Sequence, residues 1–167
     1  MIPVGIGGAI VRLGNLFNSE IIGNVTDVPW GFKFVRLYPT LPIEAVPVQL
    51  PTQLYEALCY IVTFVILAYM YYAKDMGRRR PGVLFGVGLE GIFLTRFIIE
   101  FIKIEQVDFE KGMMLDMGQI LSIPFIVLGI YMIYRGFAKP AKEVVTVQAA
   151  ANPDTKHKSH KKKTAKW

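Results

Sequence analysis

The chain has 167 residues, of which 53% are hydrophobic and only 19% charged, and its mean hydropathy is +0.38. This apolar share is above that of ordinary soluble domains and argues against a single soluble globule. The formal net charge of +6 is uneven, because residues 1–134 carry ten Lys/Arg against eleven Asp/Glu and residues 135–167 carry nine against two. The basic excess therefore belongs to the C-terminal tail and does not indicate a nucleic-acid-binding face.

Four apolar segments predict an all-α integral membrane protein. They are about residues 2–17, 54–73, 82–102 and 115–135. The last three are long enough to cross a hydrocarbon core of roughly 30 Å. The first is short and contains Arg12, so it fits a tilted span, a re-entrant segment or a helix end equally well. The third contains Glu90, Arg96 and Glu100, which should face protein or water rather than lipid.

The connecting segments predict the orientation. Four basic residues crowd the loop 74–80 and nine more lie in the tail, which places both in the cytoplasm by the positive-inside rule. The loop 18–51 then lies outside; its prolines disfavour helix, and the alternating aromatic residues at 30–34 predict a short strand or hairpin. We expect a membrane domain over residues 1–137 and a basic cytoplasmic tail over 138–167, for which disorder is the default.

Two helix ends bring polar side chains to the expected outer boundary of the membrane. Arg12 and Asn15 share one face of a helix, and a guanidinium beside an amide offers donors suited to phosphate. The alternative is an arginine that only anchors a helix end by snorkelling. Thr52 is a candidate N-cap, which places Glu56 in the first turns of the next helix, either as a functional carboxylate or as compensation for the helix dipole.

A third helix adds two charges at the same depth. Arg96 and Glu100 form an i,i+4 pair that either belongs to a polar site or merely lowers the cost of insertion. With Arg12 and Glu56 they predict a polar site at the depth of phospholipid headgroups. The partner of Glu90 stays open.

Four further residues have simple structural interpretations. Gly82 and Gly86 form a GxxxG pair that permits close helix packing. Asp116 is expected to open the last helix. Cys59, the single cysteine, excludes an internal disulfide and a CxxC metal site and is expected to be a buried small hydrophobe. We expect neither a metal nor a cofactor.

Four ordered blocks carry a family resemblance. They are VRLGNLFNSEIIG at 11–23, PTQLYEA at 51–57, RFIIEF at 96–101 and MGQILSIP at 117–124. They resemble the motifs G-R-I-G-N-F-I-N-G-E-x-x-G, H-P-S/T-Q-L-Y-E-A, R-F-x-x-E-F and M-G-Q-x-L-S-x-P of bacterial prolipoprotein diacylglyceryl transferases. The resemblance extends from about Ile2 to Arg135 and omits the tail.

The resemblance implies a multi-pass inner-membrane transferase without a cofactor. Such an enzyme moves the diacylglyceryl group of phosphatidylglycerol to the lipobox cysteine thiol in a prolipoprotein signal peptide, releasing glycerol phosphate. The family has seven spans, of which the segments here would be the last four. The resemblance also implies that the three preceding spans, with their H-G-G motif, are not in this sequence, so activity of this chain alone is in question.

By motif position the resemblance also assigns residues. Arg12, Asn15, Glu20, Gly23 and Arg96 would bind the phosphatidylglycerol headgroup, and the catalytic set would be Arg12, Arg96, Glu56 and Glu100. The two arginines would clamp the phosphate, and the carboxylates would hold them in place or relay a proton.

Three positions depart from the family motifs, and another class of function stays open. Leu50 stands where a histidine begins the family's second block, Val11 replaces a glycine, and Ile92 replaces an aromatic residue. The alternative is a non-catalytic membrane interaction or transport subunit that uses the GxxxG pair and the intramembrane Glu90.

Overall fold

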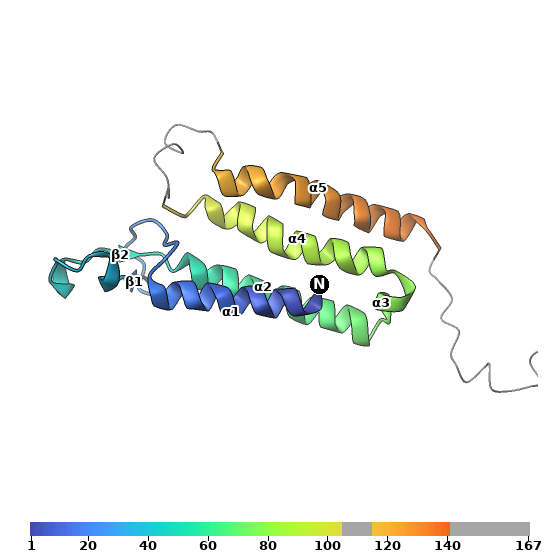
Figure 1. Cartoon of the computed structure of the whole chain (residues 1–167), viewed down its shortest axis with the longest axis horizontal. Helices are drawn as coiled ribbons and strands as arrows, with labels where there is room; N and C mark the ends of the chain where they lie inside the picture. The colour runs from blue at the N-terminus through green and yellow to red at the C-terminus, as the bar shows by residue number, and fades with distance from the viewer. Residues whose placement is uncertain (105–114, 141–167) are drawn as a thin grey trace, which may run out of the picture.

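The computed structural model describes residues 1–104 and 115–140. Its elements are α1 (Ile2–Asn18), β1 (Phe32–Lys33), the 3-10 turns η1 (Val35–Leu37) and η2 (Ile43–Ala45), β2 (Val48–Gln49), α2 (Thr52–Tyr72), α3 (Met76–Arg79), α4 (Pro81–Glu100) and α5 (Met117–Ala138). In Figure 1 the long helices lie side by side, with α1 against α2, α2 against α4 and α4 against α5. The expected tail falls almost wholly outside the described residues.

The helices bear out the predicted all-α membrane architecture. Among the described residues, α2, α4 and α5 are long and apolar enough to cross a membrane. The expected span at 2–17 forms as α1, but its 17 residues, which include the buried Arg12, do not reach that length and composition. The prediction of about four spans is thus matched by three such helices and one shorter helix packed on α2.

The loop between α1 and α2 forms a small two-stranded lobe. β1 and β2 pair antiparallel, with Phe32 opposite Gln49 and two 3-10 turns between the strands. The short strand predicted at 30–34 is thus confirmed as β1, and its partner lies at 48–49 rather than across a tight turn. β1 is short, because residues 35–37 turn into a 3-10 helix instead of extending the strand. The lobe lies where α1 ends and α2 begins (Figure 1), and we call this end of the helices the sheet end and the opposite one the α3 end.

Two of the simpler expectations have opposite outcomes. Asp116 is the N-cap of α5 and forms a capping box with Gln119, which confirms its predicted place at a helix start. Cys59 is exposed, so the prediction of a buried cysteine is wrong. The reason is the helix face: on α2 the buried side chains include Glu56 and Tyr60, and Cys59 points away from that face.

A glycine fixes the spacing of α4 and α5. A Cβ on Gly86 would lie 2.7 Å from the Gly129 carbonyl oxygen and 2.8 Å from a side-chain carbon of Ile133, closer than real Cβ atoms come. At Gly82 the nearest atom, in Met132, would be 3.7 Å away, which is ordinary contact. The predicted GxxxG packing is therefore carried by Gly86.

Gly86→Ala should destabilise the α4–α5 pair by about 1–3 kcal/mol, because backbone atoms would have to move apart. The measurement is denaturant unfolding in detergent micelles followed by circular dichroism. Gly82→Ala is the matched control on the same helix, where a Cβ meets only ordinary contacts. Equal stability of the two variants would contradict the assigned contact.

Candidate functional site

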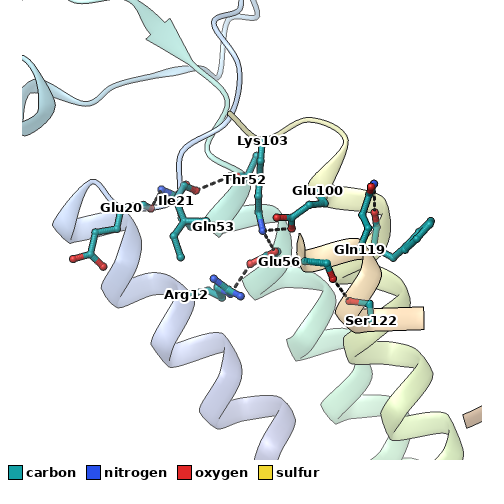
Figure 2. A network of polar contacts seen from close by, with 12 residues as sticks. Arg12, Glu20, Ile21, Thr52, Gln53, Glu56, Glu100, Lys103, Gln119 and Ser122 are labelled. Carbon is teal, nitrogen blue, oxygen red and sulfur yellow. Dashed lines mark hydrogen bonds and ion pairs between the residues drawn. The ribbon is translucent and has the colours of Figure 1, made fainter. Parts of the chain in front are cut away.

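A chain of four alternating charges lies at the sheet end of the helices (Figure 2). The Glu56 side chain is fully buried, with Oε2 2.5 Å from Arg12 Nε and Oε1 2.8 Å from Lys103 Nζ. The same Lys103 Nζ lies 2.8 Å from Glu100 Oε2. We call Arg12, Glu56, Lys103 and Glu100 the charge cluster. Its two cations and two carboxylates balance.

Because the charge cluster is buried, the stability of the protein depends on each of its ion pairs. The side chains of Arg12 and Lys103 are 10% and 4% exposed. A charge taken out of water without a partner costs several kcal/mol, whereas paired charges in good geometry largely offset that penalty. Glu56, between two cations, is therefore the residue whose removal would leave the most uncompensated charge.

Local structure sets the position of Lys103, just after α4. Gly23 forms an antiparallel bridge with Lys103, and Asn24 N donates to Ile102 O at 3.0 Å. A Cβ on Gly23 would lie 2.7 Å from side-chain atoms of both Leu50 and Thr52. The backbone at Gly23 can therefore lie this close to Leu50 and Thr52 only because the residue is glycine. The backbone of segment 11–23 thus helps to position Lys103 in the charge cluster through Gly23.

The start of α2 is tied to the turn after α1. Thr52 Oγ1 donates to the Ile21 carbonyl oxygen at 2.9 Å, and Gln53 Nε2 donates to that of Glu20 at 2.6 Å. Ile21 has φ 58°, a left-handed conformation that is costly for a β-branched residue. The prediction of Thr52 as N-cap is wrong, because Pro51 holds that position and the Thr52 hydroxyl spans the two segments instead.

The start of α5 closes the site on the Glu100 side. A Cβ on Gly118 would lie 2.7 Å from Glu100 Oε1, so the carboxylate packs directly on this glycine. Ser122 Oγ donates to the Gly118 carbonyl oxygen at 2.6 Å, and Gln119 Nε2 donates to that of Phe97 at 3.4 Å. The contacts of Gly118 and Gln119 fix α5 against the end of α4, whereas the Ser122 hydrogen bond lies within α5 (Figure 2).

Arg96 lies beside the charge cluster but does not join it. Its side chain is half-buried and forms no ion pair within the described residues. The expected Arg96–Glu100 pair is not formed, because Glu100 pairs with Lys103 one turn further on. Tyr60, buried on α2, lies within hydrogen-bonding reach of Arg12 and within electrostatic range of Arg96.

The other expected site residues lie around this centre. Asn15 is half-buried on α1. The Glu20 carboxylate is exposed and points away from Glu56, and only its backbone carbonyl is used, by Gln53 (Figure 2). Gly23 is buried and acts through its backbone. The structure thus brings Arg12, Glu56 and Glu100 together and places the remaining residues at the edge.

Sequence reasoning missed three residues at the site. Lys103 bridges the two carboxylates, Gln53 anchors the turn after α1, and Tyr60 lies within hydrogen-bonding reach of Arg12. The i,i+3 spacing of Glu100 and Lys103 was a usable signal. For Tyr60 the signal is its i,i+4 spacing from Glu56 on the same helix face.

Known proteins resemble most of this chain in sequence. The sequence model of the family described as "Prolipoprotein diacylglyceryl transferase" matches residues 1–135. No solved structure matches the chain.

Curated relatives carry one name, phosphatidylglycerol–prolipoprotein diacylglyceryl transferase. The chain is 46% identical over 149 residues to the one from Porphyromonas gingivalis, covering 83% of this chain and 51% of that protein. It is 46% identical over 140 residues to one from Bacteroides fragilis, covering 82% and 47%. For Chloroherpeton thalassium the identity is 41% over 134 residues, covering 80% and 47%. The chain spans about half the length of these relatives.

Proposed function

Because the chain belongs to the prolipoprotein diacylglyceryl transferase family, we propose that it takes part in lipoprotein maturation. The reaction transfers the diacylglyceryl group of phosphatidylglycerol to the lipobox cysteine thiol of a prolipoprotein. The cysteine thiol loses its proton, the sulfur attacks the glycerol carbon, and the carbon–oxygen bond to phosphate breaks. The bonding electrons leave on the phosphate oxygen, and the released proton balances the negative charge that they add. The products are a thioether and glycerol phosphate.

The observation that carries the proposal is an arginine without a counter-ion beside a balanced charge cluster. Arg12, Glu56, Lys103 and Glu100 satisfy one another, while Arg96 has no carboxylate partner in the described part of the chain. The region therefore has one cation in excess and would attract an anion. A guanidinium is well suited to phosphate because its donors form a planar fork.

The two arginines have separate roles in this proposal. The negative charge on the phosphate group increases as the carbon–oxygen bond breaks, and preorganised cations stabilise this added charge. Arg96 is free to bind the phosphate directly, and Arg12, oriented by Glu56, supplies a second donor group. Glu100 and Lys103 are positioning residues that hold Glu56 and the end of α4 in register.

The edge residues complete the headgroup site. Asn15, one turn beyond Arg12 on α1, would orient the glycerol headgroup through its amide. Glu20 is exposed and available to hydroxyl groups of the headgroup, and Gly23 keeps the backbone close enough to seat Lys103. The prolipoprotein's signal peptide would approach with its lipobox cysteine from the bilayer.

The proposed location is the bacterial cytoplasmic membrane, as a multi-pass protein with its tail in the cytoplasm. The basic residues of the 74–80 loop lie at the α3 end, and the charge cluster lies at the sheet end (Figure 1). By the positive-inside rule the α3 end faces the cytoplasm. The site then opens to the outer leaflet.

The test measures two quantities on the purified chain: binding of labelled phosphatidylglycerol, and transfer of its diacylglyceryl group to a lipobox peptide. We expect Arg96→Ala to abolish binding at the headgroup site and to lower transfer, and we expect Arg78→Ala, whose side chain is exposed away from the site, to keep both. Equal lipid binding and transfer by Arg12→Ala, Arg96→Ala and the unmodified chain would sink the proposed clamp. Pairing with another membrane protein without any headgroup dependence would favour a non-catalytic subunit.

A further inference from the structure

A second cationic feature lies at the α3 end, at the opposite end of the helices from the charge cluster. It is a cavity of about 260 Å³ lined by residues of α3, the start of α4 and the end of α5. Figure 1 shows that these segments lie together at this end of the helices. Its lining residues include Arg79, Arg80, Pro81, Met132, Arg135 and Lys139. Four of them are basic and none is acidic.

One of the four cations holds the cavity together. Arg80 Nη1 donates to the Gly136 carbonyl oxygen at 2.8 Å and to that of Phe137 at 3.2 Å, and its guanidinium lies 5.2 Å from the centre of the Phe137 ring. It therefore caps the carbonyl groups that the end of α5 leaves unpaired. This contact fixes the loop before α4 against α5 and gives the cavity a defined wall.

The other three cations form no ion pair with the described residues. Arg79, Arg135 and Lys139 are exposed, and the ion pairs of the described residues involve none of them. Like charges gathered around one cavity repel, and an anion bound between them would relieve that repulsion. Arginine forks favour a phosphate group.

The surroundings indicate that the phosphate belongs to a lipid. α4 and α5 are among the helices long and apolar enough to span a membrane, and the cavity lies at their ends. Tyr72, Tyr134 and Phe137 at this end are 81%, 73% and 55% exposed, as in an interfacial aromatic belt. Basic pockets between membrane helices are suited to acidic headgroups.

We propose that this cavity binds the phosphate of an anionic phospholipid, in the leaflet opposite the charge cluster. Its volume is below the roughly 300–1,000 Å³ of drug-sized sites and suits a phosphodiester whose acyl chains stay in the bilayer. Arg79 and Arg135 contact the phosphate, Lys139 adds charge at the rim, and Pro81 and Met132 form the apolar side. The site does not depend on the proposed transfer reaction.

The experiment is native mass spectrometry of the whole chain in detergent, titrated with phosphatidylglycerol and, separately, phosphatidylcholine. The variant Arg79→Gln/Arg135→Gln should bind phosphatidylglycerol more weakly at the cavity. The expected loss of affinity is about fivefold for each of the two cations removed. The matched control is Arg36→Gln/Arg78→Gln, which removes the same charge from exposed positions outside the cavity. Arg96→Ala tests the other site, next to the charge cluster. The phosphatidylglycerol binding that it loses should add to the binding lost by the cavity variant.

Three results would overturn the proposal. The first is a cavity variant that loses no more affinity than the control. The second is equal binding of phosphatidylcholine, which would show that charge is not recognised. The third is full displacement of the lipid by inorganic phosphate at equal concentration, which would assign the cavity to a free anion.

Discussion

Arg96→Ala should lower diacylglyceryl transfer about 10²–10³-fold, the range seen when one preorganised charge-stabilising donor is removed. Stability should change by no more than about 0.5 kcal/mol, because substitutions that break no buried pairing usually stay within that range. Arg96 is half-buried and has no ion pair among the described residues, so its removal leaves no carboxylate stranded. A loss of function without a loss of stability is the signature of a group that acts on substrate.

The measurement pairs initial transfer rates and phosphatidylglycerol binding with denaturant unfolding of the same samples. Arg96→Lys should recover charge but not the planar fork, and therefore only part of the rate. Arg78→Ala, an exposed arginine at the α3 end, should match the unmodified chain in every assay. If Arg96→Ala unfolds as readily as a variant of Glu56, the residue is structural and the proposed clamp is wrong.

The helices could be predicted from sequence because their signals are local. These signals act within a few residues or across one helix contact: the apolar runs, Asp116 as a helix cap, and Gly86 as the glycine that allows close packing. The face of α2 that holds Glu56 could not be predicted, since it depends on which neighbours α2 packs against. The outcome for Cys59 shows this: an apolar sequence context is the same for a side chain facing lipid and one facing a neighbouring helix.

Three members of the charge cluster were predicted, but Lys103 and the pairing of the charges were not. The resemblance indicated Arg12, Glu56 and Glu100, and the structure brings them together. The i,i+4 rule favoured Arg96 as the partner of Glu100, yet Lys103 takes that place because its backbone is bridged to Gly23 from the other side of the site. A contact between segments 80 residues apart in sequence leaves no local pattern.

The second large effect is expected on stability. Glu56→Gln keeps the shape of the side chain but leaves Arg12 and Lys103 beside a neutral amide, in a place where Glu56 is fully buried. Removing one partner of a buried ion pair costs about 3–5 kcal/mol. We expect a loss of that size in the free energy of unfolding, measured by circular dichroism in detergent. Glu20→Gln, at an exposed carboxylate, should stay within about 0.5 kcal/mol.

A double variant separates the charge effect from simple loss of packing. Arg12→Met/Glu56→Gln removes one cation with one carboxylate and leaves the Lys103–Glu100 pair intact, so the remaining cluster is again balanced. The two substitutions should therefore not add, and an interaction energy of about 0.5–3 kcal/mol is expected. Strictly additive losses would show that Arg12 and Glu56 do not stabilise one another. The hydrogen bonds of Thr52 and Gln53 to the turn after α1 would then be what holds the site in place.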